Sequence, residues 1–289
     1  LAAAQLVETA LRAHASGMAE GDTVHRAARA LSAALVGRTL TGFASALVTV
    51  EAAADRFGLV GRGVRSVSAR GKHLLLELDG GVVLHTHLGM HGRWRLQPAG
   101  APRPDFARAV VDTAEVTAVC LGAPTVELLA PRQLLHHPRL SRLGPDLLAA
   151  SFDADVARVR LRAAGEREIG VALLDQRALA GIGNVYKSEA LFTCRLHPRR
   201  LLSTLDDVAL DAVVAAARRL MARNLGPDER RTTSSLAAER YFVYRRRGRP
   251  CRLCGTAIER LAQGDPPRAS WFCPRCQPAA VPSGREAPR

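Results

Sequence analysis

The first regular pattern of apolar residues along the chain predicts an amphipathic helix. These residues recur three and four positions apart, as one face of a helix requires: Val24, Ala27, Ala28, Leu31 and Leu35. Asp22 and Thr23 precede the pattern and can cap the helix, and Gly37 follows as a residue that ends it. We therefore expect one helix directly after residues 18–21.

Short apolar runs between about residues 40 and 129 are typical of strands. The runs predicted to be strands are Leu47–Val50, His73–Leu78, Val82–His87 and Ala118–Leu121. Asp79-Gly80-Gly81 separates the second run from the third and is a hairpin signal. We expect this half of the chain to be a mostly antiparallel sheet structure with one helix laid on it.

The second half is predicted to be helical from about Ala154 to Arg223, after a linker within residues 143–151. An irregular basic stretch follows over residues 224–250. The predicted domains are residues 18–148, 149–247 and 248–278, with a disordered tail over residues 279–289.

Four cysteines near the end of the chain have the spacing of a metal site. Cys251, Cys254, Cys273 and Cys276 form C-x2-C-x18-C-x2-C, in which each pair places two sulfur atoms on one side of an ion. Residues 255–272 are long enough for two short strands and a turn. Two disulfides or four unrelated core cysteines are the alternatives, but disulfides suit a small secreted chain and nothing here resembles a signal peptide. We predict one structural zinc ion.

The charge of the chain favours a polyanionic partner. A formal net charge of +14 over 289 residues points to nucleic acid, although a biased genome is another source of arginine. Only two of the 41 basic residues are lysines, Lys72 and Lys187, so each is a candidate for a specific role. Hydrophobic residues make up 47% of the chain and no apolar run has membrane-spanning length, so we expect a globular cytosolic protein.

Residues 173–192 (LLDQRALAGIGNVYKSEALF) carry the most specific motif. Gly181 and Gly183 allow a tight turn between two helices, and the second helix is expected to begin near Asn184 with unpaired amide groups. Such a helix end attracts a phosphate, and the Asn184 side chain can add a donor. An ordinary packing corner between two helices is the alternative.

Four motifs together resemble the formamidopyrimidine-DNA glycosylase and endonuclease VIII family of base-excision repair enzymes. Residues 173–192 resemble its helix-two-turn-helix element and residues 244–277 its zinc finger. Residues 19–24 (AEGDTV) resemble the N-terminus of the endonuclease VIII branch, and residues 71–76 (GKHLLL) a lysine-bearing strand. The resemblance implies an α+β fold: an N-terminal antiparallel β-sandwich with flanking helices, a C-terminal helical domain with the helix-two-turn-helix, and a β-hairpin zinc finger.

The resemblance assigns three residues to catalysis. The α-amine of the mature N-terminal residue, here Ala19, attacks C1′ of a damaged nucleotide and forms a Schiff base, which suits a terminal amine with a pKa of about 8. Glu20 is the adjacent acid that moves protons, and Lys72 contacts the phosphate beside the flipped nucleotide. The alternatives are a surface glutamate before a helix and a charge at the end of a strand.

Three further residues are implied to bind DNA. Asn184 and Arg268 contact phosphates, and Met90 fills the gap that a flipped base leaves. Met90 resembles the formamidopyrimidine branch, so the chain mixes features of both branches. A core methionine and a solvated hairpin arginine are the alternatives. The remaining histidines that we considered have no metal-ligand spacing and are interpreted as surface or core residues: His25, His73, His91, His136 and His137.

Two features depart from the family pattern. Alanine stands where the family presents proline, although a primary amine can also form an imine. In addition, 17 residues precede Met18, and an amide nitrogen at Ala19 cannot act as the nucleophile. We expect residues 1–17 to be a start-site artefact or a disordered extension, with Met18 as the true start.

These observations predict a monomeric, cytoplasmic, nucleoid-associated DNA glycosylase and AP lyase without a membrane partner. It is expected to excise oxidised bases, with pyrimidines favoured, from duplex DNA. The other hypothesis is a protein of the same fold that binds damaged DNA without excising bases. Both hypotheses keep the phosphate and zinc motifs, and only the N-terminus distinguishes them.

Overall fold

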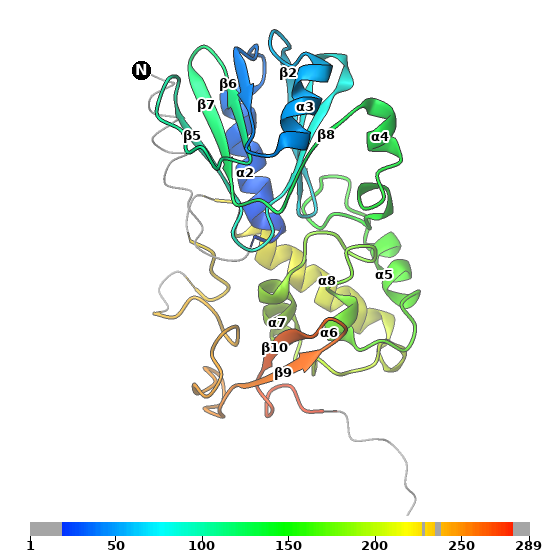
Figure 1. Cartoon of the computed structure of the whole chain (residues 1–289). Coiled ribbons are helices and arrows are strands. Elements are labelled where there is room, and N and C mark those ends of the chain that lie inside the picture. Colours follow the sequence, from blue (N-terminus) through cyan, green and yellow to red (C-terminus); the bar gives the residue numbers. More distant parts are fainter. Residues whose placement is uncertain (1–18, 227–228, 235–237, 280–289) are drawn as a thin grey trace, which may run out of the picture.

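Two four-stranded antiparallel sheets and helix α2 (Gly21–Leu35) form the N-terminal part of the protein (Figure 1). The computed structural model describes residues 19–226, 229–234 and 238–279. One sheet has the strand order β2-β3-β4-β8 and the other the order β1-β6-β7-β5. The strands are β1 (Gly42–Ala44), β2 (Val64–Arg70), β3 (His73–Leu78), β4 (Val83–His87), β5 (Arg93–Pro98), β6 (Ala109–Asp112), β7 (Val116–Leu121) and β8 (Thr125–Leu129).

Helix α2 joins the two sheets into one core. It contacts β2 and β3 of one sheet and β5 and β7 of the other. Its predicted apolar stripe faces this core, where Val24, Leu31 and Leu35 pack with leucines of β3. The predicted strands at residues 73–78, 82–87 and 118–121 are confirmed in β3, β4 and β7. The turn Asp79–Gly81 connects β3 to β4, as its glycines indicated.

Two local predictions are wrong. Leu47–Val50 leads into helix α3 (Val48–Phe57), whose buried positions Val50 and Ala54 lie four residues apart. A four-residue apolar run is too short to distinguish a strand from the first turn of a helix. Asp22 and Thr23 do not cap α2, because the helix already begins at Gly21 and Asp22 lies in its first turn.

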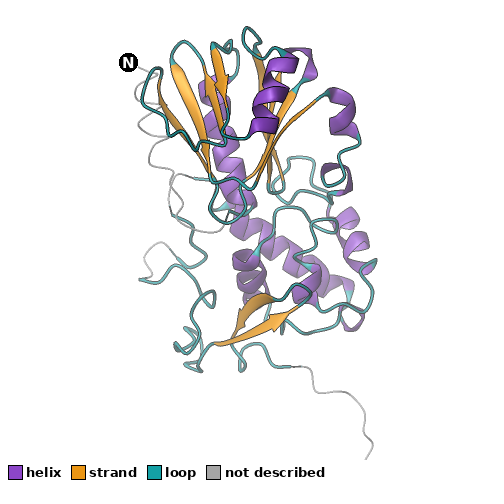
Figure 2. Ribbon diagram, in the orientation of Figure 1, coloured by secondary structure: helices purple, strands orange, loops and turns teal. Residues whose placement is uncertain are grey.

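Four helices and a β-hairpin form the C-terminal part (Figure 2). The helices are α5 (Ala154–Arg162), α6 (Ile169–Ala172), α7 (Asn184–Thr193) and α8 (Asp207–Ala222), as predicted for this half; α4 (Pro131–Leu135) and the 3-10 turns Leu140–Arg142 and Leu202–Thr204 are short. Helix α7 packs against α8 and against β10 (Arg268–Phe272), which pairs with β9 (Glu259–Gln263). The hairpin predicted between the cysteine pairs is therefore confirmed. In the part of the chain that the structure describes, no helix is long and apolar enough to cross a membrane.

The segment after α4 connects the two parts of the molecule through hydrogen bonds. Asp146 is buried, and its Oδ2 accepts hydrogen bonds from the backbone N–H of Gly71 at 2.7 Å and from His25 Nε2 at 2.9 Å. Gly71 has a φ of +60°, and a Cβ at this position would lie 2.9 Å from the Cβ of Ala180. A larger residue would therefore push the β2–β3 turn away from the C-terminal part.

Candidate active site

A cleft of about 710 Å³ lies between the N-terminal and C-terminal parts. Five of the residues predicted from the sequence line it: Ala19, Lys72, Met90, Asn184 and Arg268. They come from the start of α2, the β2–β3 turn, the loop after β4, the first residue of α7 and the first residue of β10. Segments separated by up to about 250 residues in the chain thus converge on one cavity.

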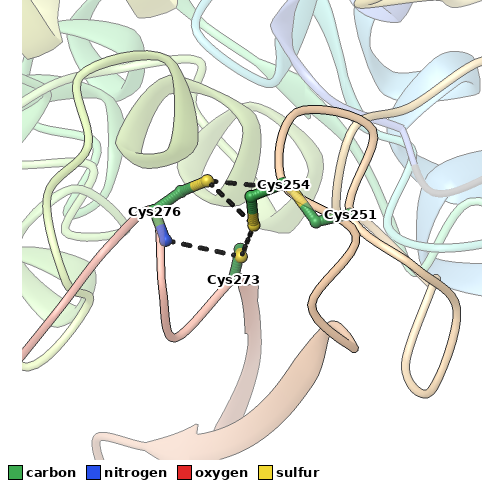
Figure 3. Close-up of side chains that lie close together, drawn as sticks. All are labelled: Cys251, Cys254, Cys273 and Cys276. Carbon is green, nitrogen blue, oxygen red and sulfur yellow. Dashed lines mark hydrogen bonds between the residues drawn. The ribbon is translucent and has the colours of Figure 1, made fainter.

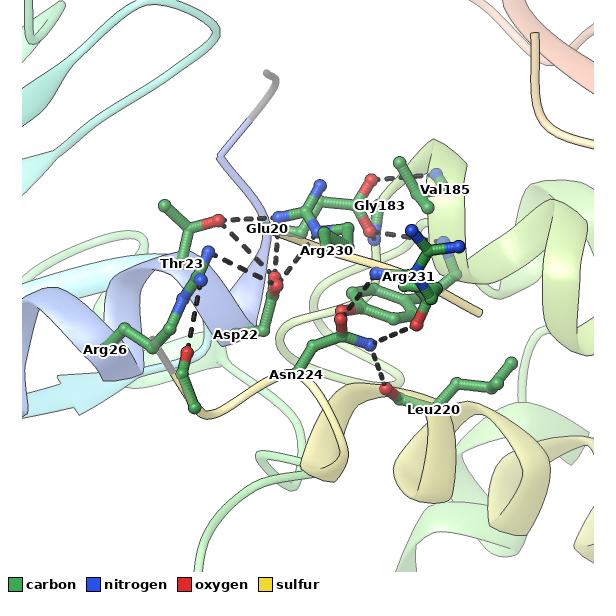
Figure 4. Close-up of polar contacts among 12 residues, drawn as sticks. Glu20, Asp22, Thr23, Arg26, Gly183, Val185, Leu220, Asn224, Arg230 and Arg231 are labelled. Carbon is green, nitrogen blue, oxygen red and sulfur yellow. Dashed lines mark hydrogen bonds and ion pairs between the residues drawn. The ribbon is translucent and has the colours of Figure 1, made fainter. Parts of the chain in front are cut away.

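Glu20 follows Ala19 in the chain and lies at the N-terminal end of α7, next to Gly183 and Val185 (Figure 4). Its Oε1 accepts a hydrogen bond from the backbone N–H of Val185 at 2.8 Å, and Oε2 accepts from Gly183 at 2.9 Å and Tyr186 at 3.3 Å. A Cβ on Gly183 would lie only 2.4 Å from Cδ of Glu20. Gly183 is therefore needed so that the carboxylate can approach the helix end.

This arrangement corrects the prediction of unpaired amides at the start of α7. The amides predicted to attract a phosphate already bind the carboxylate of Glu20, which is fully buried. A carboxylate satisfies the same donors and the same positive helix end as a phosphate does. Asn184 lines the cleft, so its side chain, not the helix amides, remains the candidate phosphate ligand at this end of α7.

Lys72 lies half-buried in the cleft directly after Gly71. Burial lowers the pKa of its amine to about 8; the Glu20 carboxylate opposes this shift, and the Arg268 guanidinium adds to it. Lys72 therefore remains mainly a cation at pH 7, the form that binds a phosphate.

Arg268 and Met90 are the exposed members of the set. Arg268 begins β10 and is exposed to solvent, and Met90 is 57% exposed in the loop after β4. Exposure of this extent excludes the core methionine that the sequence left open. Both residues line the cleft, Met90 from the N-terminal part of the molecule and Arg268 from the C-terminal part.

Asp22 and Arg230 form a buried ion pair that the sequence did not indicate. Arg230 Nη2 lies 2.6 Å from Asp22 Oδ1, and its Nε donates to Oδ2 at 2.9 Å (Figure 4). The guanidinium also stacks over the ring of Tyr186 in α7. This pair connects the start of α2 to the segment after α8 and to α7, so it supports the position of Glu20.

A second buried carboxylate in α7 organises the basic stretch after α8. Glu189 Oε1 accepts from the backbone N–H groups of Val243 and Tyr244 at 2.9 and 2.8 Å, and Oε2 accepts from Phe242 at 2.9 Å and from the Thr232 hydroxyl. Burial raises the pKa of Glu189, and these donors oppose the rise. The sequence carries no local signal for this role, because the donors lie 43 to 55 residues further along the chain.

The four cysteines come together beside α7 with the geometry of a zinc site (Figure 3). Their sulfur atoms lie 3.8 Å apart for Cys251 and Cys276 and 3.5 Å apart for Cys254 with either Cys273 or Cys276. Tetrahedral zinc with bonds of about 2.3 Å to sulfur separates its ligands by about 3.8 Å, whereas a disulfide needs about 2.05 Å. The residues fit one structural zinc, which holds the hairpin on Phe192 of α7.

The spacing of histidines along the sequence did not reveal a histidine cluster on the β2-β3-β4-β8 sheet. His85 Nδ1 and His137 Nε2 lie 2.9 and 3.0 Å from Glu127 Oε2, and His73 Nδ1 lies 2.8 Å from His85 Nε2. The backbone N–H groups of residues 139 and 140 donate to His137 Nδ1, so the proton of that ring is on Nε2 and points at the carboxylate. Nε2 of His137 therefore has no lone pair for a metal, and the cluster is a hydrogen-bond network.

Family models match three consecutive parts of the chain. The formamidopyrimidine-DNA glycosylase N-terminal domain matches residues 18–124, and the formamidopyrimidine-DNA glycosylase H2TH domain matches residues 143–235. The zinc finger found in FPG and IleRS matches residues 248–279.

Curated relatives match over nearly the whole length. A protein named probable endonuclease 8 2 from Streptomyces coelicolor is 41% identical over 281 residues, which cover 94% of this chain and 99% of that protein. The DNA-(apurinic or apyrimidinic site) lyase Nei2 of Mycolicibacterium smegmatis is 38% identical, and the match covers 91% of this chain and 100% of that protein.

Solved structures share the fold. Lactococcus lactis formamidopyrimidine-DNA glycosylase, bound to DNA that contains an AP site, matches with a TM-score of 0.76 at 25% identity. The match covers 90% of this chain and 100% of that one. The matched domains, the relatives and this fold agree, and the chain belongs to the formamidopyrimidine-DNA glycosylase and endonuclease VIII family.

Proposed function

We propose that the protein is a bifunctional DNA glycosylase and AP lyase of base-excision repair that acts on oxidised bases and abasic sites in duplex DNA. The observation that carries this proposal is the convergence of Ala19, Lys72, Met90, Asn184 and Arg268 on one cleft, with Glu20 beside Ala19. Relatives that carry the names endonuclease 8 and AP lyase support the same activity.

In the proposed reaction the free amine of Ala19 attacks C1′ of the damaged nucleotide. The new C1′–N bond forms as the bond to the base breaks, and the sugar ring opens to a Schiff base. Glu20 takes the proton that the amine loses and returns it to the ring oxygen, and the expelled base takes a proton from water. Oε1 of Glu20 accepts a single hydrogen bond among the described residues, from Val185, so it keeps a lone pair for this proton. A C2′ proton of the Schiff base is then lost to a base, and the C3′–O bond to the 3′-phosphate breaks, which cuts the strand.

The other residues of the cleft are proposed to hold DNA. Lys72, Asn184 and Arg268 supply two cations and one amide, a set that suits consecutive phosphates of one bent strand. Met90 lines the cleft from the N-terminal part of the molecule and is proposed to fill the gap left by the flipped nucleotide. Oxidised pyrimidines are the favoured substrates in this proposal, and the protein is proposed to act as a monomer.

The test compares duplexes that differ at one position: an undamaged base pair, an abasic site, or thymine glycol. Protein that begins at Met18, from which the initiator methionine is removed, is expected to cut both damaged strands and to leave the undamaged duplex intact. Binding of both damaged duplexes without any cutting would refute the enzyme and favour a damaged-DNA-binding protein of the same fold. Residues 1–18 lie outside those that the structure describes, so the free amine is part of the test.

A further inference from the structure

Lys187 is the second of the two lysines in the chain and has no part in the reaction proposed above. It lies in the first turn of α7 and is fully buried, although it belongs to the type of residue least often found inside a protein. A buried lysine is retained only when its amine has partners, and this one has two that the structure defines.

The amine of Lys187 bridges the two segments that carry the proposed phosphate ligands. Nζ donates to Oδ1 of Asn184 at 3.1 Å, one turn back on the same helix. It also donates to the carbonyl of Ala269 at 2.9 Å, the residue directly after Arg268 in β10. One nitrogen atom thereby joins the Asn184 side chain to the backbone directly after Arg268, although 85 residues separate Asn184 from Ala269 in the chain.

The chemistry of an ammonium group makes this bridge directional. An ammonium ion only donates hydrogen bonds, so it must face the oxygen of the Asn184 amide and never the nitrogen. The amide nitrogen is then left for the cleft that Asn184 lines, where a phosphate oxygen can accept its hydrogens. The bond to Ala269 fixes the start of β10 at the same time.

We propose that Lys187 is a positioning residue that orients the Asn184 amide and holds Arg268 at the distance that one DNA strand requires. The inference rests on the proposed function, because it takes Asn184 and Arg268 as phosphate ligands. Lys187 itself is enclosed and touches no substrate.

The protonation of Lys187 is expected to be coupled to DNA binding. Burial lowers the pKa of its amine to about 7; Glu20 opposes the shift, and Arg268 and Lys72 add to it. A neutral amine carries a lone pair and can accept a hydrogen bond from the Asn184 side-chain nitrogen. Loss of the proton therefore allows the Asn184 amide to face Lys187 with either its oxygen or its nitrogen. A phosphate bound nearby favours the ammonium form, so DNA is expected to raise the pKa of Lys187.

The variants Lys187→Met, Lys187→Arg and Ser188→Ala separate positioning from simple packing. Methionine keeps the length of the stem and removes the donors, whereas arginine keeps donors and charge. Ser188 is the matched control: it is buried in the next position of α7, accepts from the N–H of Trp271 in β10 and donates to the Asn184 carbonyl, but makes no bond to the Asn184 side chain.

The first readout is affinity for a duplex with a non-cleavable abasic analogue. Lys187→Met is expected to weaken it about ten-fold or more, as loss of a charge-assisted hydrogen bond does. Lys187→Arg should recover part of this loss, and Ser188→Ala should change affinity less than three-fold. The single-turnover rate at saturating enzyme should fall less than the affinity. In a protein that already carries Asn184→Ala, Lys187→Met should reduce the affinity for DNA little further, because both substitutions act through the Asn184 amide.

The second readout is titration of the lysines by NMR. Protein labelled with 13C-lysine has two lysine side-chain signals, and Lys187→Arg identifies one of them. That signal is expected to titrate near pH 7 and to shift to higher pH when the duplex is added. Additive losses in the double variant, equal losses in Ser188→Ala, or an unshifted titration would each overturn the role of Lys187. Failure of the proposed function is distinguishable, because the unmodified protein would then neither prefer nor cut abasic DNA.

Discussion

Replacement of Glu20 by glutamine should destabilise the protein as well as inactivate it, because this carboxylate caps α7. Its two oxygens accept three backbone hydrogen bonds, from Gly183, Val185 and Tyr186. A glutamine amide keeps one oxygen and presents an NH2 group where the other oxygen was. At least one backbone N–H then faces a donor instead of an acceptor, whichever way the amide turns.

The magnitude follows from these contacts. A hydrogen bond to a charged group contributes about 1.5–3 kcal/mol, and a negative charge at a helix N-terminus adds about 0.3–1 kcal/mol. Glu20→Gln should therefore lower the free energy of unfolding by about 2–4 kcal/mol, since Glu20 is fully buried and water cannot replace the lost partner. Glu51→Gln is the matched control: the Glu51 carboxylate is half-buried and accepts a hydrogen bond from the Ser45 N–H, so its replacement should cost about 1 kcal/mol or less.

Urea unfolding followed by circular dichroism measures both variants against the unmodified protein, with zinc present throughout. Excision of oxidised bases by Glu20→Gln should be lost even in buffer where the variant is fully folded, whereas some imine formation at preformed abasic sites should remain. If Glu20→Gln unfolds at the same urea concentration as Glu51→Gln, Glu20 does not cap α7 and the geometry described above is wrong.

Three further predictions concern the phosphate ligands, the metal and the histidine cluster. Arg268→Ala should weaken binding to damaged and undamaged duplexes alike and reduce the slope of log K against log salt by about one; an unchanged slope would show that Arg268 is only solvated. Removal of zinc by a chelator should abolish DNA binding while the N-terminal part stays folded. The reason is that the hairpin packs on α7 through Cys251 and Cys273 and has few other apolar residues. A zinc content of less than about half an equivalent in purified protein, without recovery on reconstitution, would contradict the zinc site. Burial lowers the pKa of His73 to about 3 and that of His87 to about 4, so the unfolded chain takes up protons below about pH 6.5 that the folded protein does not, and stability should fall from about pH 6.5 to pH 4. His73→Asn, which can keep the donor to His85, should make this fall shallower, and an equally steep fall would refute the assignment.

Local sequence patterns predicted the parts of the site that depend on local geometry. The spacing of Cys251, Cys254, Cys273 and Cys276 defines two turns and a hairpin without reference to the rest of the chain. The leucines of His73–Leu78 and the glycines after Asp79 likewise define a strand and a turn through backbone preferences alone.

Contacts between distant segments could not be predicted in this way. Asp22 has the spacing of a helix cap, but its partner is Arg230, 208 residues away. Glu20 occupies the amides of α7 only because α2 and α7 meet, so the motif at Gly183 indicated a free anion site that the fold fills internally. Met90 and Arg268 were found through resemblance, since a single exposed side chain leaves no periodic signal.

The measurement that tests the account most directly is covalent trapping on abasic-site DNA with borohydride, followed by mass spectrometry of the linked peptide. Two forms are compared: protein that starts at Met18, so that removal of methionine frees Ala19, and the 289-residue chain. We predict that the short form is trapped through the α-amine of Ala19 and that a form which retains residues 1–17 is not. Equal trapping of both forms, or a link to Lys72 in the short form, would contradict the central claim that the amine of Ala19 is the nucleophile.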